Sequence, residues 1–275
     1  MTTQWIIDKM EEWAPEKWAI ETDNVGLIVG DRMRPVSRIL TALDLSEDVL
    51  REAVQGRYDF VITHHPLISR HTQPINRITT DNVLGKKLMT LIGNGIGLYC
   101  AHTNLDAAPG GVNDLLFDIV GLIEKEPLLP PTKNNFSSEN NFPTLGLSGY
   151  LKEPMKLSEL AANIAKTLNI ENILRYVGPP DMLIHKAGLC SGGGTALLKA
   201  ALEKNCDVFI SGDIGYHMAM DTIESGMALI DGTHYATEIP IAKAVADYLK
   251  KAAKHSGFDL VIDISQVNGQ VFRNT

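Results

Sequence analysis

The sequence predicts an α/β protein made of two related lobes, in which helices flank the sheets. Short apolar runs bounded by Gly, Pro and Asp alternate with amphipathic segments of helical period, which is typical of this fold class. The second half of the chain also repeats the order of elements of the first half. With 275 residues and 44% hydrophobic side chains, the chain is long enough to build two cores of ordinary size.

Several apolar runs have the length and the boundaries of strands. They are residues 38–43, 59–63, 96–101, 186–190, 207–211, 228–231 and 260–264. Helical periodicity predicts helices over residues 2–13, 46–55, 82–93, 157–168, 195–204, 218–225 and 239–255. Ser46 is a suitable N-cap for the second helix, and Pro240 fits the first turn of the last helix.

One stretch interrupts this alternation. Residues 127–143 contain four prolines, lack a helical period and are polar at the centre, so they cannot bury enough apolar surface to offset the entropy of ordering. We therefore expect a linker over residues 130–143, between an N-terminal lobe of residues 1–129 and a C-terminal lobe of residues 144–275.

The two lobes match when the sequence is displaced along itself. A displacement of about 148 positions aligns residues 36–65 with residues 184–213 without a gap, and apolar positions fall on apolar positions. A displacement of about 131 positions then aligns residues 95–98 with residues 226–229. The match indicates either a repeated unit or the general likeness of any two strand–helix–strand segments, and the sequence leaves both interpretations open.

Composition argues against several classes of function. The net charge of −8 and the lack of a basic cluster argue against nucleic acid as a partner, because that affinity rests on clustered Lys and Arg. No apolar run is long enough to span a bilayer, and acidic residues near the N-terminus argue against a signal peptide. The widely spaced Cys100, Cys190 and Cys206 are expected to be buried, reduced thiols of a cytoplasmic protein.

Imidazoles and carboxylates gather at the ends of the predicted strands. In open α/β sheets, ligands bind in the crevice at the carboxyl ends of the strands. Three imidazoles and two carboxylates are more than one tetrahedral zinc ion requires, so the pattern favours a site for two metal ions. The candidate ligands are His64, His65, Asp106, His234 and Glu238.

Several of these residues also have simpler interpretations. His64 and His65 are consecutive in an extended segment and point in opposite directions, so they serve two ions, or one ion and its surroundings. Asp106 could instead form a turn or cap a helix, and Glu238 could complement the dipole of the helix that follows it. His102 is either a ligand or a group that orients one.

Two loops near the predicted strand ends are further candidates. Asp213 and His217 follow the strand at residues 207–211 and are candidates for proton transfer or substrate binding at the rim, with a plain loop as the alternative. The glycines at residues 192–194 precede a predicted helix. Their amides could hold a phosphate, or the glycines could simply permit a tight turn.

Short motifs in a fixed order connect these candidates. They are residues 23–30, 42–44, 63–67, 101–106, 111–114, 212–217 and 234–238. In this order they resemble the signature of the GTP cyclohydrolase 1 type 2 homologue family, also called NGG-one-interacting factor three-like proteins. Longer members of that family carry an inserted domain between the halves. Residues 130–143 stand in its place here, so the chain resembles the short form.

The resemblance implies an assembly, a metal centre and an activity. It implies a toroidal homohexamer built as a trimer of dimers, in which each subunit holds two divalent metal ions in the cleft between its lobes. The ligands are the five named above, and zinc, iron, manganese, cobalt and nickel all suit such a set.

The activity implied is that of a metal-dependent hydrolase acting on a nucleotide or a related small phosphorylated molecule. His102 and His217 are the candidate catalytic residues for proton transfer. The alternative is a non-enzymatic metal-binding ring that acts as a scaffold, a metal store or a metal delivery protein. The sequence lacks a GxxxxGK[ST] phosphate loop that would support a nucleotide independently.

Overall fold

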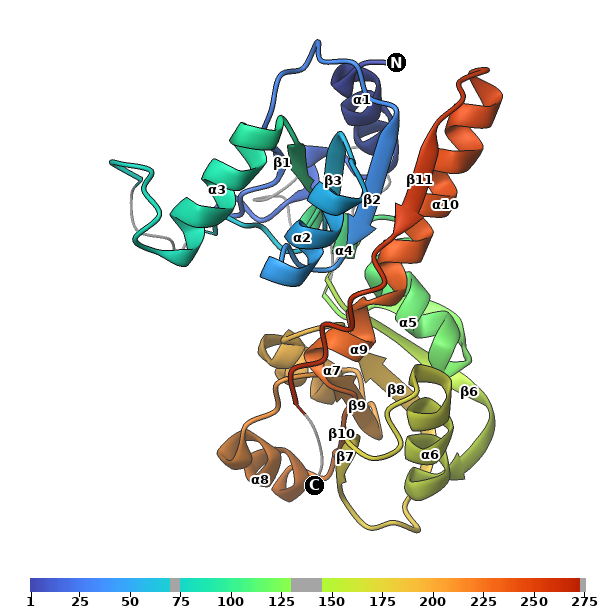
Figure 1. Ribbon diagram of the computed structural model, residues 1–275. Coiled ribbons are helices and arrows are strands. Elements are labelled where there is room, and N and C mark those ends of the chain that lie inside the picture. The colour runs from blue at the N-terminus through green and yellow to red at the C-terminus, as the bar shows by residue number, and fades with distance from the viewer. Residues whose placement is uncertain (70–74, 130–144, 273–275) are drawn as a thin grey trace. The chain divides into compact units, whose positions relative to one another are not determined.

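The computed structural model describes residues 1–69, 75–129 and 145–272 (Figure 1). The chain divides into two compact units. Unit 1 comprises Met1–Ala108 and Ile241–Gly269, and unit 2 comprises Pro109–Pro240 and Gln270–Thr275. Both units are built from a sheet flanked by helices, which confirms the predicted fold class. Within the described residues, no helix has the length and apolar character that a membrane span requires.

Unit 1 contains a five-stranded sheet in the order β1-β4-β3-β2-β11. Its strands are β1 (Gly26–Val29), β2 (Arg38–Ala42), β3 (Phe60–Thr63), β4 (Gly97–Cys100) and β11 (Val261–Ile264). Its helices are α1 (Thr3–Trp13), the 3-10 helix η1 (Glu16–Trp18), α2 (Glu47–Gln55), α3 (Val83–Asn94), α4 (Thr103–Ala107) and α10 (Pro240–His255). Strands β11, β2, β3 and β4 are parallel, and β1 is antiparallel to β4.

Helices cover both faces of the unit 1 sheet. Apolar residues of α2 and α3 form one buried cluster with residues of β2, β3 and β4. Helix α10 packs on the opposite face, where the Thr41 hydroxyl donates a hydrogen bond to the Ala242 carbonyl (2.8 Å). Ser46 caps α2 by accepting the N–H of Val49 (3.1 Å), as predicted. Strands buried on both faces explain the uninterrupted apolar runs of the sequence.

Unit 2 contains a six-stranded sheet in the order β5-β6-β8-β9-β10-β7. Its strands are β5 (Leu122–Pro127), β6 (Leu147–Lys156), β7 (Arg175–Val177), β8 (Leu183–Leu189), β9 (Val208–Ser211) and β10 (Ala228–Asp231). Its helices are α5 (Val112–Val120), α6 (Leu157–Leu168), η2 (Gly194–Leu197), α7 (Leu198–Glu203), α8 (Tyr216–Glu224) and α9 (His234–Glu238). Helices α5 and α6 pack on one face, and η2, α7 and α8 pack on the other.

The two units repeat the same parallel core. The first displacement places β2, α2 and β3 on β8, α7 and β9, and the second places β4 on β10. Asp59 accepts two backbone N–H groups near the start of β2 (2.8 and 2.9 Å), and Asp207 accepts two within β8 (2.7 and 2.9 Å). Because an aspartate accepts two backbone N–H groups at the equivalent position in both units, the structure favours a repeated unit over the general likeness of strand–helix–strand segments.

The boundaries of the two units differ from those of the predicted lobes. Strand β11 pairs with β2, so the C-terminal segment with α10 and β11 belongs to unit 1 and not to the second lobe. Strand β5 pairs with β6, so residues 109–129 belong to unit 2. The division into units therefore follows which strands pair with each other, and not the order of the segments along the sequence. The predicted linker at residues 130–143 lies outside the described residues.

Candidate metal centre

In unit 1, four candidate side chains follow neighbouring parallel strands. His64 and His65 come directly after β3, and His102 follows β4 and precedes α4, which carries Asp106. Strands β3 and β4 are parallel and adjacent, so their carboxyl ends meet at one edge of the sheet. The sequence therefore placed these residues at the correct edge.

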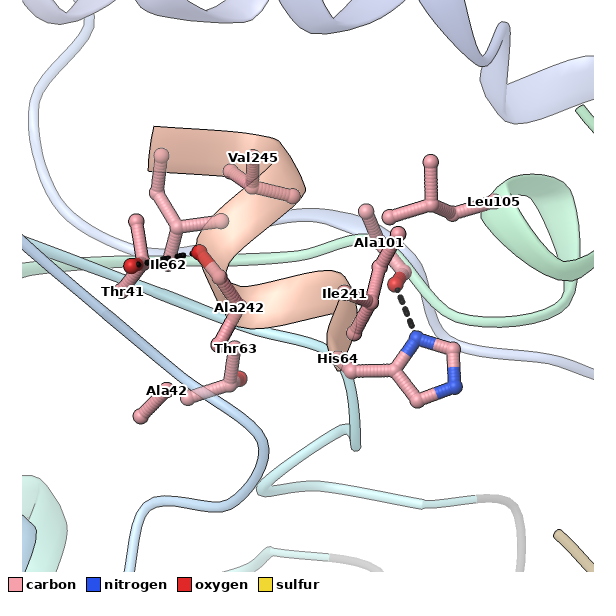
Figure 2. Close-up of a pocket in the computed structure, with 10 residues that line it drawn as sticks. All are labelled: Thr41, Ala42, Ile62, Thr63, His64, Ala101, Leu105, Ile241, Ala242 and Val245. Carbon is pink, nitrogen blue, oxygen red and sulfur yellow. Dashed lines mark hydrogen bonds between the residues drawn. The ribbon is translucent and has the colours of Figure 1, made fainter. Parts of the chain in front are cut away.

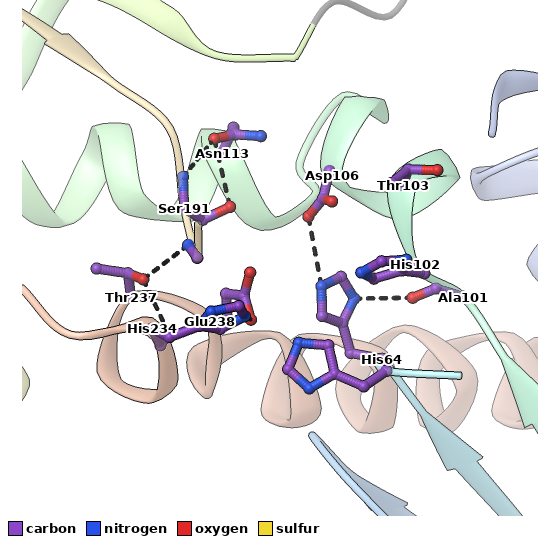
Figure 3. A network of polar contacts seen from close by, with 12 residues as sticks. His64, Ala101, His102, Thr103, Asp106, Asn113, Ser191, His234, Thr237 and Glu238 are labelled. Atoms are coloured by element: carbon purple, nitrogen blue, oxygen red, sulfur yellow. Dashed lines mark hydrogen bonds and ion pairs between the residues drawn. The ribbon is translucent and has the colours of Figure 1, made fainter. Parts of the chain in front are cut away.

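The unit 1 side chains form one cluster. One nitrogen from each of His64, His65 and His102 lies within 4.8 Å of the others. The ring centroids of His64 and His65, and those of His64 and His102, are 5.1 Å apart. Asp106 Oδ1 lies 3.4 Å from His64 Nε2, and Figure 3 shows the two side chains facing each other. Three imidazoles and a carboxylate can together hold a divalent metal ion.

His64 is fixed by the surrounding backbone. Its Nδ1 lies 2.8 Å from the Ala101 carbonyl, and the side chain is buried. Figure 2 shows this contact beside a small apolar cavity lined by residues of β2, β3 and α10. The Cys100 thiol donates to the His64 carbonyl (3.0 Å), and burial raises the pKa of this thiol, so Cys100 stays protonated and acts as a buried thiol.

Two aspartates contact the other rings of unit 1. Asp44 Oδ1 lies 2.7 Å from His65 Nδ1, and Asp23 Oδ2 lies 2.8 Å from His102 Nδ1. Burial alone would raise the pKa of Asp23. Hydrogen bonds from His102 and from the Thr103 hydroxyl and amide outweigh burial and lower this pKa, so Asp23 is an anion. Neither Asp23 nor Asp44 was predicted as a site residue, although both lie in the motifs that carry the family resemblance.

In unit 2, the short helix α9 carries the other predicted ligands. α9 follows β10, and His234 and Glu238 lie one helical turn apart, with His234 Nε2 3.1 Å from Glu238 Oε2 (Figure 3). Glu238 is buried and His234 is partly exposed. Asp213, in the loop after β9, places Oδ2 2.6 Å from His234 Nδ1. Asp213 therefore contacts the ring of a candidate ligand.

The glycines after β8 leave room for this pair. Gly192 has φ +60°, and a Cβ there would lie 2.0 Å from Glu238 Oε1 and 3.0 Å from His234 Nε2. The Gly192 amide donates to Thr237 Oγ1 (3.0 Å), and the Gly194 amide donates to Ser211 Oγ (2.9 Å). Both amides already donate hydrogen bonds to hydroxyl groups of unit 2. The observed contacts therefore favour a role of these glycines in close packing over a role in phosphate binding.

His217 lies apart from these groups. It is exposed in the first turn of α8, and its ring contacts that of Tyr216 at 5.3 Å. Among the described residues, none of the clusters able to hold a metal ion includes His217. Its predicted role in proton transfer remains a prediction.

The fold and these side chains define a class of protein. It is an α/β protein with imidazole and carboxylate groups, suited to divalent metal ions, at the carboxyl ends of its parallel strands. Residues 1–270 match the family described as Duf34/NIF3 (NGG1p interacting factor 3). The chain belongs to this family, as its motifs predicted.

Relatives and solved structures agree with this assignment. A Clostridium acetobutylicum protein named GTP cyclohydrolase 1 type 2 homolog is 36% identical over 259 residues, covering 94% of this chain and 93% of the relative. A Halalkalibacterium halodurans protein of the same name is 26% identical over 368 aligned positions, which cover 98% of each chain. The alignment is longer than this chain, so that relative contains additional residues. The crystal structure of a Bacillus cereus protein related to NIF3 has a TM-score of 0.91, at 25% identity, and covers 100% of this chain and 99% of its own.

Proposed function

We propose that this protein binds two divalent metal ions per chain and is a metal-dependent hydrolase of a nucleotide or a related small phosphorylated molecule. The proposed ligands are His64, His65, Asp106, His234 and Glu238, acting together in one dinuclear centre. The observation that carries the proposal is the close grouping of three imidazoles after β3 and β4. The His234–Glu238 pair on α9 supplies further donors of the same kinds.

Imidazole and carboxylate are the donors of zinc, iron, manganese, cobalt and nickel sites. A divalent ion in such a site supplies a water of lowered pKa and polarises the bond under attack. His102 is the proposed proton acceptor, because Asp23 holds its Nδ1 and its ring contacts those of His64 and His65. His217 is the second proposed proton-transfer residue. The names of the relatives suggest a purine nucleotide such as GTP as the substrate.

The first experiment measures metal stoichiometry. Elemental analysis of gently purified protein should give about two transition-metal ions per chain. Glu238→Ala and Asp106→Ala should each lower that number, because neither water nor a neighbouring imidazole replaces an anionic ligand. Saturation at one ion per chain in the wild type would contradict a dinuclear centre.

The second experiment tests catalysis. Metal-loaded protein is screened against nucleotides and phosphoesters, with Glu238→Ala as the control for contaminating hydrolases. We expect turnover that depends on the metal and is lost in the variant. Full metal binding without turnover of any compound would instead support the alternative of a metal-storing, metal-delivering or scaffolding ring.

We also propose that the chain forms a homohexamer, a trimer of dimers. Exposed apolar side chains on α3 support self-association, since Val83 is 56%, Met89 46% and Ile92 59% exposed. Light scattering coupled to size exclusion should give about six times the chain mass of 30.1 kDa. A monomer at micromolar concentration would contradict this assembly.

A further inference from the structure

The four imidazoles of the candidate centre share one feature. In each ring, Nδ1 lies within hydrogen-bonding distance of a carbonyl or carboxylate oxygen, which accepts a hydrogen bond and has none to donate. For His64 this oxygen is the Ala101 carbonyl (2.8 Å). For the other three it belongs to an aspartate. The Nδ1–oxygen distances are 2.7 Å for His65 and Asp44, 2.8 Å for His102 and Asp23, and 2.6 Å for His234 and Asp213.

This feature indicates which nitrogen of each neutral ring carries the proton. A carbonyl or a carboxylate accepts hydrogen bonds, so these contacts favour Nδ1 as the donor and leave the lone pair of the neutral ring on Nε2. In His234 the contact of Nδ1 with Asp213 (2.6 Å) is shorter than that of Nε2 with Glu238 (3.1 Å), which favours the same tautomer. The Nε2 atoms of His64 and His234 lie 3.4 and 3.1 Å from the Asp106 and Glu238 carboxylates. The nitrogen that holds the lone pair is therefore the one that faces the proposed carboxylate ligands.

We propose that Asp23, Asp44 and Asp213 are positioning residues of the metal centre. Each holds one imidazole as the Nδ1–H tautomer, fixes the ring orientation and makes Nε2 a stronger donor. The inference rests on the proposed function for its metal, while the tautomer of each ring is a property of the metal-free protein as well. It assigns a role to carboxylates that are not themselves proposed ligands.

The three aspartates differ in their surroundings, and the difference selects the best variants. Asp23 is largely buried and accepts four hydrogen bonds, from His102, from the amide and hydroxyl of Thr103 and from the amide of Asn24. Removing it would disturb the local backbone. The side chains of Asp44 and Asp213 are 52% and 59% exposed, so substitutions there disturb the surrounding packing less than a substitution of Asp23 would.

Asp213→Asn is the sharpest substitution. Asp213 has φ +55°, in the left-handed region, which Asn tolerates as well as Asp does. The variant therefore keeps the backbone and the shape of the side chain and removes the charge on the oxygen that faces His234. Asp44→Asn makes the same change beside His65. Asp48→Asn and Asp181→Asn are matched controls, since both carboxylates are exposed and form surface ion pairs.

The first measurement is Zn²⁺ affinity by competition with a chelator, after circular dichroism has shown that each variant is folded. We expect Asp44→Asn and Asp213→Asn to bind Zn²⁺ about 10–100-fold more weakly than the wild type, the usual effect of losing such a partner. The two controls should bind as tightly as the wild type. Unchanged affinity in both site variants would overturn the inference.

The second measurement is the tautomer of each ring in the metal-free protein, from the ¹⁵N chemical shifts of labelled histidines. Neutral His65, His102 and His234 should be Nδ1–H tautomers in the wild type, and Asp213→Asn should change the signals of His234 alone. The exposed His217 and His255 serve as internal references. An Nε2–H tautomer for His234 in the wild type would overturn the inference even if no variant folded.

The two proposals can fail separately. If the wild type binds no Zn²⁺, the proposed function fails, and the tautomers still decide whether the aspartates orient the rings. If the wild type binds two ions and the Asp variants bind them equally well, the positioning role fails and the dinuclear centre stands.

Discussion

Gly192→Ala tests the candidate centre without removing any proposed ligand. An alanine Cβ at this position would lie 2.0 Å from Glu238 Oε1, 2.8 Å from Glu238 Cδ and 3.0 Å from His234 Nε2. Atoms cannot approach so closely, and the Glu238 side chain is buried, so the carboxylate must leave its position. We expect loss of metal binding from a substitution that adds one methyl group.

Two effects must be separated in this variant. Gly192 has φ +60°, so alanine in this left-handed backbone conformation also destabilises the fold, by about 1–2 kcal/mol. Gly226→Ala is the matched control, because Gly226 has φ +88° in the same unit and nothing lies within 4 Å of an added Cβ. Each kcal/mol lowers the melting temperature by about 2–4 °C in a chain of this size, so both variants should melt a few degrees lower.

Metal affinity distinguishes the two variants. Loss of an orienting partner already weakens metal binding by about 10–100-fold, so displacement of Glu238 should cost about 100-fold or more, or at least about 2.7 kcal/mol. Chelator competition with Zn²⁺ measures this difference. If Gly192→Ala binds Zn²⁺ as tightly as Gly226→Ala, then Glu238 is not a ligand, and the reasoning from its contact with His234 is refuted.

Three further predictions use single substitutions. Glu238→Ala should lose at least one metal ion by elemental analysis. His217→Ala should keep both ions and, if the protein is an active enzyme, lose about 10²-fold or more in turnover. Loss of metal in the His217→Ala variant would make His217 a ligand. Thr233 has φ +62° and ψ 149°, a conformation that costs about 1–3 kcal/mol for a residue with a side chain. Thr233→Gly should therefore raise the melting temperature. Thr233→Ala should lower it, because alanine keeps the backbone strain and loses the hydroxyl that caps α9. The reverse order of melting temperatures would show that the backbone is unstrained. Ser46→Ala should lower the free energy of unfolding, measured with denaturant, by about 1 kcal/mol, because the α2 cap is lost. An unchanged free energy of unfolding would show that another group replaces the hydroxyl.

The sequence predicted the parallel strands well, because most of them are buried on both faces and each contains a short apolar run. Strands β2, β3, β4, β8, β9, β10 and β11 all lie where apolar runs predicted them, within a few residues. Strands β1, β5, β6 and β7 are antiparallel, and none of them was predicted. β5 and β7 are largely exposed, and β6 is polar and exposed from Lys152 to Pro154, so none of these three forms a continuous apolar run. Their pairing with neighbouring strands, rather than their composition, makes them strands.

The candidate ligands were predictable for a related reason. Residues at the carboxyl end of a buried parallel strand have a defined place in the fold, so histidines after β3 and β4 could be placed at one edge from sequence alone. Asp23 and Asp44 could not be assigned a role in this way. Asp23 precedes an antiparallel strand, and the contact of either aspartate with a ring depends on tertiary packing across many residues. The short helices α4 and α9 were also missed, since five residues give too little periodicity.

The repeated core shows which residues folding needs and which the site needs. Asp59 and Asp207 brace equivalent strands in the two units and lie away from every candidate ligand, so we expect their role to be structural. At the strand ends the units differ: the positions of His64 and His65 after β3 correspond to Gly212 and Asp213 after β9. After β3 this position carries the imidazole of His65, and after β9 it carries the carboxylate of Asp213, which contacts the His234 ring. The repeated core therefore presents different side chains at its strand ends in the two units. The proposed ligands of unit 2, one imidazole and one carboxylate, are fewer than a four-coordinate metal site requires. Metal stoichiometry, measured on the whole chain, therefore tests whether the proposed ligands hold two ions.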